Sequence, residues 1–358
     1  MKAECMEKIE LTSEQKKLIK SYMPRFKKYT EGVQFPNDQD ERAKRIDYFQ
    51  IELRKKLPDI SESEIEELVV KLWASQMWGN KLYFAQKVIA DNGIEKLRNE
   101  LSRLLDISIP ISDRYDHFLK EIKGLGPASL TEMMCYIQPE CCGIWNKKAR
   151  LAIKILKLDF FVNPDKYRIS AQEYQKFNNV LLAIAEVSRE ESYKSADLLF
   201  VDFYLYETGQ VTAPIQDDAK TFDHDEMKDL IQNIGVMLGF DSETEIPVGH
   251  GAKVDVIWRA RIGNLGLVTY VFEVHKSGSI DSLLLNLQKS KSSPTVQKVI
   301  AVSDEAQLEK IKKESEGLPE EFRRSLGFWK VIEIQEVAES LQSAMEKINQ
   351  LGLVQGAF

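Results

Sequence analysis

The first two-thirds of the chain repeat apolar residues at three- and four-residue steps, which is the spacing of one face of an α-helix. Over residues 41–57 this spacing continues until Pro58, and a capping pair at Ser63 and Glu66 opens a run that continues to Gly79. Further helices are predicted over residues 80–91, 94–105, 171–189, 193–206 and, with Asp113 as its cap, 113–122. This part of the chain is therefore predicted to be all-helical.

From about residue 223 the pattern changes to short apolar runs that alternate with helical segments. Asp223 and Glu226 open a helix that ends at Gly239. Strands are predicted over residues 245–248, 253–258, 267–274, 297–302 and 328–334, and helices over 279–290, 304–314 and 335–350. We therefore predict a multidomain α and α/β protein, with a helical domain at 1–210 and an α/β domain at 211–358.

Composition and charge narrow the class of protein. The chain has 358 residues, with 49 Lys and Arg against 56 Asp and Glu, and its net charge of −7 excludes a uniformly basic coat for nucleic acid. No apolar run approaches the roughly 18 residues of a membrane span, and the polar start MKAECMEKIE is not typical of a secretory signal. We expect no membrane partner and a cytoplasmic location. The cysteines are expected to be reduced thiols, because their spacing suits neither a disulfide scaffold nor a zinc site; they are Cys5, Cys135, Cys141 and Cys142.

The stretch IKGLGPASLTEMMCYI, residues 122–137, combines a glycine turn with a helix start. Gly124 and Gly126 allow the backbone to turn with positive φ, and Pro127 suits the first position of the second helix. The amides exposed at that helix start form a site for an anion. Residues 120–154 include six basic and three acidic residues, so this segment is basic although the chain as a whole is acidic.

This stretch resembles the helix-hairpin-helix motif, here residues 113–137, which clasps a DNA backbone phosphate, and its helical surroundings resemble the DNA-glycosylase superfamily. The resemblance implies DNA contacts by the turn and by the basic run after it, through Gly124, Leu125, Gly126, Lys147, Lys148 and Arg150. The alternative is a tight interhelical turn without a ligand. Where that superfamily has its essential Asp and, in bifunctional members, its Lys, this chain has Asn146 and Ala128, so base excision is disfavoured.

The last third contains GHGAKVDVIWRARIGNLGLVTYVFEVHKSGSIDSLLLNLQKS, which resembles the PD-(D/E)XK restriction-endonuclease-like superfamily over residues 223–335. The resemblance implies a mixed central sheet in which an Asp of the second strand meets a (D/E)-x-K sequence of the third. The matching residues are Asp255 and Glu273-Val274-His275, and Glu226 is a further metal-associated acid. The expected cofactor is Mg²⁺, for which Mn²⁺ can substitute, held at Asp255, Glu273 and Val274 with Glu226 nearby.

Strand alternation places Asp255 on the face of Ile257, and Glu273 on the face of His275. The repulsion between two carboxylates at the ends of adjacent strands is relieved by a hard cation that prefers oxygen ligands. The alternative is a pair of structural salt bridges with Lys253 and Lys276.

His275 departs from the family, which usually has Lys at this position to orient the attacking water. A neutral imidazole can also bind water or act as a base. Lys276 follows but points to the opposite face of a regular strand. Gln288, on the next helix, is a secondary candidate, because relatives use polar residues of this helix near the scissile phosphate.

Together these features predict a metal-dependent deoxyribonuclease, with an endonuclease as the favoured type, that acts in DNA repair or genome defence. DNA is the expected partner, and a homodimer is one arrangement that the fold resemblance implies. Two alternatives stay open. One is a DNA-binding protein that has lost catalysis, which the departure at His275 favours. The other is a base-removing enzyme, which Asn146 disfavours.

Overall fold

The computed structural model describes residues 9–77, 81–210, 222–248, 252–263 and 266–349. The chain divides into two compact units, one formed by residues 1–76 and 81–215 and the other by most of the chain from Gln216 onward. We call them the helical unit and the sheet unit. The boundary predicted between residues 210 and 211 falls at the start of 211–221, which lies outside the described residues.

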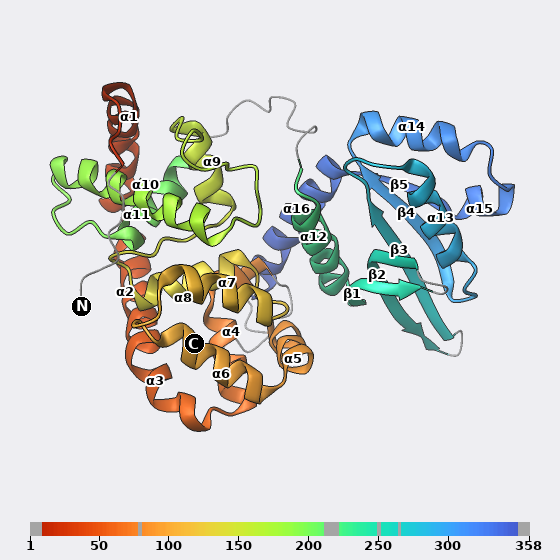
Figure 1. The fold of residues 1–358 in the computed structure, drawn as a ribbon, viewed down its shortest axis with the longest axis horizontal. Helices are drawn as coiled ribbons and strands as arrows, with labels where there is room; N and C mark the ends of the chain where they lie inside the picture. Colours follow the sequence, from red (N-terminus) through yellow and green to blue (C-terminus); the bar gives the residue numbers. More distant parts are fainter. Residues whose placement is uncertain (1–8, 78–80, 211–221, 249–251, 264–265, 350–358) are drawn as a thin grey trace. The chain divides into compact units, whose positions relative to one another are not determined.

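The helical unit contains only helices among its described elements (Figure 1). Their bounds are α1 Ser13–Thr30, α2 Phe35–Asp47, the π-helix η1 Tyr48–Glu52, α3 Leu53–Lys56, the 3₁₀-helix η2 Leu57–Asp59, α4 Glu62–Lys71, the 3₁₀-helix η3 Trp73–Met77, α5 Lys81–Asn92, α6 Ile94–Leu105, α7 Ile111–Glu121, α8 Pro127–Ile137, α9 Lys147–Ile155, α10 Ala171–Glu190 and α11 Leu198–Thr208. No described helix of the chain is both long enough and apolar enough to cross a membrane.

Several predicted helix ends differ from the observed ones. The capping box before α4 is formed by Ser61 and Glu64, not by Ser63 and Glu66, because Ser61 has the extended backbone that a cap requires. The predicted end at Gly79 lies outside the described residues, and α4 already stops at Lys71. Asp113 is an acidic residue of the first turn of α7, while Pro110 occupies the cap position.

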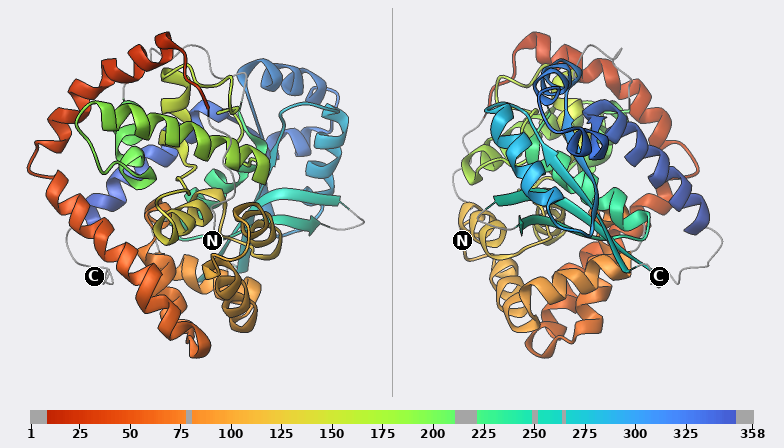
Figure 2. Two further views of the ribbon diagram at one scale, coloured as in Figure 1. Left: turned by 60° about the vertical axis from the view of Figure 1, so that its left-hand side comes forward. Right: turned by 90° about the vertical axis from the view of Figure 1, so that its right-hand side faces the viewer.

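The sheet unit has a five-stranded mixed sheet, with helices on both of its sides (Figure 2). Its elements are α12 His224–Met237, β1 Asp241–Val248, β2 Ala252–Ile262, β3 Gly266–Val274, α13 Ile280–Lys291, β4 Val296–Ser303, α14 Glu305–Ser315, α15 Glu320–Ser325, β5 Leu326–Lys330 and α16 Val331–Asn349. The strands lie in chain order; β1, β2 and β3 are antiparallel neighbours, and β4 and β5 continue in parallel. The predicted α and α/β class, with a mixed sheet, is confirmed at this level.

Two apolar cores hold these layers together. Side chains of α13, α14 and α15 pack with strand residues such as Val271 and Val299 on one face. Side chains of α12 and α16 pack with Phe272 and Val302 on the other. Neighbouring strand residues therefore alternate between the two cores, as the pleat of a strand requires.

One predicted strand is wrong at its end. Residues 331–334 were expected to complete the strand 328–334, but they form the first turn of α16. The sequence VIEI alternates like a strand over four residues, whereas Val331, Ile334 and Ala338 keep the helical spacing and are all buried. The longer helical period decides the structure here.

Helix α12 lies unusually close to the sheet at Gly235. A Cβ atom at this position would come within 2.4 Å of the indole nitrogen of Trp258 in β2. That nitrogen donates a hydrogen bond of 3.0 Å to the carbonyl of Ile231, one turn earlier in α12. The contact fixes α12 against β2, and α12 also carries side chains of the site described next.

Candidate functional site

Two carboxylates face each other where β2 and β3 stop pairing through their backbones. The register between these strands runs as far as Val256 opposite Phe272, so Asp255 and Glu273 stand opposite each other one step further. The Asp255 amide donates to Glu273 Oε2 at 3.1 Å, and the Val274 amide donates to Asp255 Oδ2 at 2.7 Å. Each side chain thus accepts a backbone hydrogen bond from the other strand.

The strict alternation expected around Asp255 is interrupted. Val254 packs in the core under α13, while Val256, two residues on, packs in the opposite core under α12. Residues two apart on a regular strand share one face. The irregular backbone at Asp255 allows its side chain to meet Glu273 from β3 and also a residue of α12.

The two carboxylates differ in their affinity for a proton. Burial, together with the charge of Asp255, raises the pKa of Glu273 to about 8. Burial also opposes ionisation of Asp255, but hydrogen bonds from His224 and the Val274 amide outweigh it, so the pKa of Asp255 lies below its ordinary value. At neutral pH the pair therefore carries its negative charge on Asp255 and a proton on Glu273.

Two polar side chains complete the surroundings of the pair, and the sequence analysis did not select them. His224, the first residue of α12, places Nε2 3.3 Å from Asp255 Oδ2, and this contact raises the pKa of the imidazole. Asn286 of α13 donates from Nδ2 to Glu273 Oε1 at 2.8 Å. The sequence contained no signal that singled out these two side chains, because α12 and α13 also place other polar residues, such as Asn233 and Ser290, among their buried positions.

The helix residues selected from the sequence lie two positions away from these two. Gln288 follows Asn286, and Glu226 follows His224, in each case by two residues. Two residues correspond to about 200° around a helix, so each prediction named the right helix but a side chain on another face. Glu226 occupies the third position of α12, and its backbone amide donates to Oδ1 of the capping residue Asp223 at 3.1 Å.

The third position of the (D/E)-x-K sequence is buried. The amide of His275 donates to the Val302 carbonyl at 2.7 Å, and its own carbonyl accepts a hydrogen bond from the Ser303 hydroxyl. Burial lowers the pKa of the His275 imidazole, opposed by the charge of Asp304 at the start of α14. Lys276, the next residue, is exposed.

The expected alternative, salt bridges with Lys253 and Lys276, gives the wrong partner for Asp255, which lies at ion-pair distance from His224. Lys253 pairs with Glu245 of β1. Within the described residues, no group of three or more His, Cys, Asp and Glu side chains is arranged to hold a metal ion. The pair of half-buried Asp255 and buried Glu273 nevertheless fits Mg²⁺ by its chemistry, because this ion is commonly bound by one or two carboxylates together with substrate phosphates.

The predicted hairpin is present in the helical unit. Helix α7 ends at Glu121, and α8 begins at Pro127 with Gly126 as its cap. Gly124 has φ of 86°, as expected, whereas Gly126 has φ of −80° and does not use the left-handed region. Leu125 is buried and anchors the turn.

Contacts from two other segments brace this turn. The side-chain amide of Asn92 bridges both backbone groups of Lys123, with 2.9 Å in each direction. The Tyr167 hydroxyl lies 3.0 Å from the place that a Cβ at Gly126 would occupy. The turn is therefore held in one conformation, with the start of α8 beside Tyr167.

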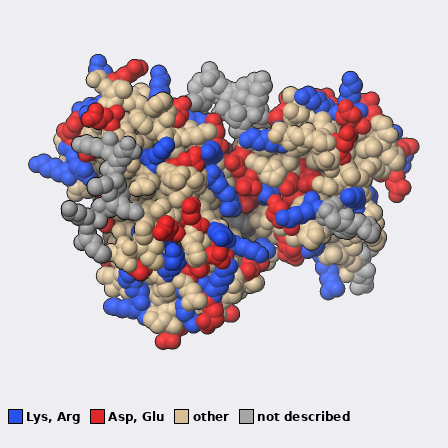
Figure 3. Space-filling view, viewed as in Figure 1, with Lys and Arg blue, Asp and Glu red and all other residues tan. Residues whose placement is uncertain are grey.

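The basic residues after the hairpin differ in accessibility. Lys147 is exposed and Lys148 half-buried, but Arg150 is buried, with its guanidinium 5.9 Å from the ring centre of Tyr167. The expectation of an open contact by Arg150 therefore needs correction: its helical position turns it into the interior. On the face shown in Figure 3, basic and acidic side chains are interspersed over the described parts of both units.

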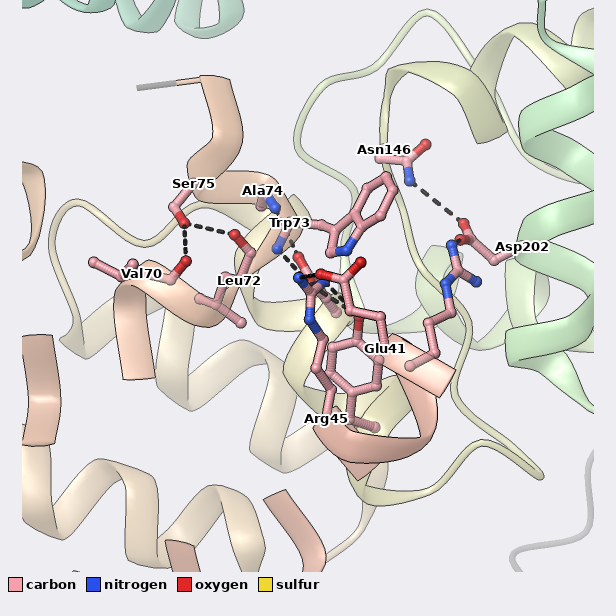
Figure 4. A network of polar contacts seen from close by, with 12 residues as sticks. Glu41, Arg45, Val70, Leu72, Trp73, Ala74, Ser75, Asn146 and Asp202 are labelled. Atoms are coloured by element: carbon pink, nitrogen blue, oxygen red, sulfur yellow. Dashed lines mark hydrogen bonds and ion pairs between the residues drawn. The ribbon is translucent and has the colours of Figure 1, made fainter. Parts of the chain in front are cut away.

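Asn146, the residue at the position of the glycosylase Asp, caps a helix. Its Oδ1 accepts from the Ala149 amide at 2.8 Å, and its Nδ2 donates to Asp202 Oδ1 at 3.4 Å (Figure 4). Asp202 is itself buried and paired with Arg42 at 2.7 Å. The carboxylate beside Asn146 is thus neutralised by a buried guanidinium.

Comparisons of this chain with protein-family models, with curated proteins and with solved structures gave no significant match. The two family resemblances therefore rest on the sequence motifs described above.

Proposed function

We propose that this protein is a DNA nuclease that depends on Mg²⁺ or Mn²⁺ and hydrolyses phosphodiester bonds. The observation that supports it most is the pair of half-buried Asp255 and buried Glu273, which lie opposite each other where the backbone pairing of β2 and β3 ends. Burial and the neighbouring charge raise the pKa of Glu273 to about 8. A divalent cation that replaces this proton would balance the charges of both carboxylates, which otherwise repel each other when both are ionised.

In this proposal each residue of the site has a defined task. Asp255 and Glu273 hold the cation, which supplies Lewis-acid polarisation of the phosphodiester when it is bound. Asn286 keeps Glu273 in place through its hydrogen bond of 2.8 Å, and His224 does the same for Asp255 at 3.3 Å. His275 is the proposed third group of the site, with an imidazole that burial favours in its neutral form.

The reaction is a displacement by water. The water oxygen forms a bond to phosphorus as one phosphorus–oxygen ester bond breaks, and the electron pair leaves on the sugar oxygen. The products are a phosphomonoester and a free hydroxyl, and the two protons of the water end on these two groups.

The helical unit supports DNA as the substrate. The turn at Gly124–Gly126 presents the start of α8, and helix starts favour a phosphate through their free amides and their dipole. Lys147 follows as an exposed cation. We propose that this surface holds the DNA backbone without reading its sequence, and that the protein acts in DNA repair or genome defence.

One experiment separates the proposed function from its rivals. Duplex, nicked, single-stranded and damaged DNA are incubated with the protein in Mg²⁺ or Mn²⁺, with EDTA and Asp255→Asn as controls. Backbone cleavage that EDTA and Asp255→Asn both abolish supports the nuclease. Retention on a gel without cleavage supports a binding protein, and breaks that appear only after alkali support base removal.

A DNA-binding protein without catalysis is the second candidate. It is favoured by His275, which replaces the usual Lys and lies buried next to the charge of Asp304. Base removal has less support, because Asp202, the acid to which Asn146 donates a hydrogen bond, is paired with Arg42.

A further inference from the structure

A third acidic residue stands in line with the carboxylate pair. The register of β1 and β2 pairs Thr244 with Val256 and Ile246 with Val254, which leaves Glu245 opposite Asp255. Since Asp255 is opposite Glu273 on its other side, the three acids form a row across β1, β2 and β3. Opposite residues on neighbouring strands lie close enough for their side chains to interact.

Glu245 has an unusual backbone. Its φ of 58° lies in the left-handed region, which in the described part of the chain is occupied by only two other residues that are not glycine. This conformation is unfavourable for a side chain such as Glu inside a strand, so the surroundings must hold it there. It occurs beside Asp255, where the alternation of β2 is also interrupted.

Two lysines form ion pairs with the Glu245 carboxylate, one with each oxygen. Lys228 of α12 pairs with Oε1 and Lys253 of β2 pairs with Oε2. They differ in accessibility: the side chain of Lys228 is 12% exposed and that of Lys253 is 58% exposed. Lys228 also pairs with Asp225 at 2.9 Å.

Lys228 is connected to the carboxylate pair by His224, which lies on the same helix. It lies one turn after His224, and residues four apart share a helix face. His224 contacts Asp255, and the charge of Lys228 acts on the His224 imidazole. A half-buried ammonium group therefore stands beside the row of acids, in contact with Glu245.

We propose that Lys228 is the cationic catalytic residue of this site, and that Glu245 is a positioning residue which directs its ammonium group toward the scissile phosphate. This inference rests on the proposed nuclease function. As water attacks, negative charge grows on the phosphoryl oxygens, and a cation held in place with little access to water stabilises that charge most effectively. Lys228 loses no proton and forms no covalent bond in this role.

We assign the cationic role to a residue of α12, because neither of the two residues that follow β3 is a suitable cation. His275, where a Lys would be expected, is buried beside Asp304, and Lys276 is exposed. Lys228 is the lysine that combines low exposure with a contact to the acid opposite Asp255.

The test compares Lys228→Met with Lys253→Met, because both variants remove one ammonium group from the same glutamate. We expect Lys228→Met to lower kcat about 100-fold or more with KM changed by less than about threefold, since the contact forms in the transition state. Lys253→Met, which removes an exposed ion pair, is expected to stay within about threefold in both constants. DNA affinity by fluorescence anisotropy without added metal should be unchanged in both variants.

Two further variants separate positioning from stability. Lys228→Arg keeps the charge and should recover part of kcat. Glu245→Asn keeps a residue that tolerates positive φ but removes the carboxylate, and should lower kcat while its unfolding midpoint stays near that of the wild type. A purely structural ion pair would lower the unfolding midpoint and leave kcat of the folded protein unchanged.

The outcomes are distinct. If the wild type cleaves DNA and Lys228→Met cleaves as fast as Lys253→Met, Lys228 has no catalytic role while the nuclease function stands. If a Lys228→Met protein does not fold, equal kcat for Glu245→Asn and wild type overturns the inference in the same way. If the wild type cleaves no DNA with Mg²⁺ or Mn²⁺, the proposed function fails and the role of Lys228 fails with it.

Discussion

At the scale of single residues, the proposed chemistry depends on how half-buried Asp255 and buried Glu273 lie against each other. Each accepts a backbone hydrogen bond from the opposite strand, so the carboxylates replace a rung of the sheet. This arrangement keeps two acids close without an intervening lysine. It explains why one of them retains a proton at neutral pH.

The first prediction concerns Asp255. Asp255→Asn keeps the shape of the side chain and its contact with the Val274 amide but removes the charge that attracts a cation. Mg²⁺-dependent cleavage should fall below detection, and calorimetric titration should show Mn²⁺ binding weakened at least about tenfold. The circular dichroism spectrum should match that of the wild type. Unchanged cleavage would remove Asp255 from the mechanism.

The second prediction follows from the raised pKa of Glu273. Between its unfolded value of about 4.3 and its folded value of about 8, the native state holds a proton that the unfolded chain has released. The free energy of unfolding should therefore fall as pH rises through this window, by an amount on the order of 5 kcal/mol. Glu273→Gln should flatten this dependence and be the more stable protein at pH above about 8.

Urea unfolding without metal, repeated between pH 5 and pH 9, measures how the free energy of unfolding depends on pH in the wild type and in Glu273→Gln. Glu309→Gln is the matched control, because the Glu309 side chain is 64% exposed and lies on α14. It should keep the pH dependence of the wild type. Parallel curves for wild type and Glu273→Gln would show that Glu273 does not retain its proton.

At the scale of elements, the hairpin presents the start of α8 to a proposed phosphate, whereas α12 carries His224 and Lys228 of the proposed site, and the two helices are held differently. The turn before α8 is fixed by Asn92 and Tyr167, which belong to distant segments. Helix α12 is fixed by the contact of Gly235 with Trp258. In both cases close packing fixes the position of the helix, while the local sequence sets where it begins, Gly126-Pro127 for α8 and the Asp223 cap for α12.

The third prediction tests the hairpin. Gly126→Ala is compatible with the backbone at φ of −80°, but its Cβ would lie 3.0 Å from the Tyr167 hydroxyl and would displace it over the start of α8. DNA affinity measured by anisotropy should fall about three- to tenfold, with little change in unfolding midpoint. Adding Tyr167→Phe should restore affinity, because it removes the atom in conflict.

Gly93→Ala is the control for this series. Gly93 has φ of 77° and open space around it, so alanine there strains the backbone by about 1–2 kcal/mol. It should lower the unfolding midpoint and leave DNA affinity unchanged. If Gly126→Ala binds DNA like the wild type, the turn is a structural connection only.

At the scale of the whole molecule, an acidic protein is proposed to bind an acidic polymer. The net charge of −7 opposes binding at long range, so affinity must come from local cations. Lys147 and Lys148 are candidates in the helical unit, while the buried Arg150 serves the packing around Tyr167.

The fourth prediction concerns salt. If Lys147 or Lys148 contacts a phosphate, its replacement by Ala should reduce the slope of log affinity against log salt by about 0.9. Lys44→Ala removes a 75% exposed lysine paired with Asp40 and should leave the slope unchanged. Arg150→Ala should instead lower stability. Equal slopes for all of these proteins would argue against a phosphate contact by the basic run.

The sequence was sufficient for those features that depend on local pattern. Alternating and helical periods located the five strands and most helices, and Gly126-Pro127 marked the start of α8. The pair of Asp255 and Glu273 was implied by the resemblance to the PD-(D/E)XK superfamily, and the register of β2 and β3 places the two residues opposite each other. Features that depend on distant contacts did not: the partners His224 and Asn286 were missed, because only the folded sheet selects which helix face reaches it.

Where two periods compete over a few residues, the pattern alone also fails. The four residues VIEI fit a strand and a helix equally well, and the choice was made by the later positions Ala338 and Leu341, which pack in the core under α16. The left-handed backbone of Glu245 leaves no trace in the sequence at all, since Glu is not a residue that favours it.

The seat of α12 on β2 has a consequence for how this protein can evolve. Because no side chain fits at position 235 while an indole fills position 258, selection acts on the two residues as one unit. A mutation at either position alone would change how α12 packs on β2. Because α12 carries His224 and Lys228, such a mutation would affect the site from a distance. Descendants of this chain should keep glycine and tryptophan together or exchange both, and that paired inheritance would identify relatives after their other residues have diverged.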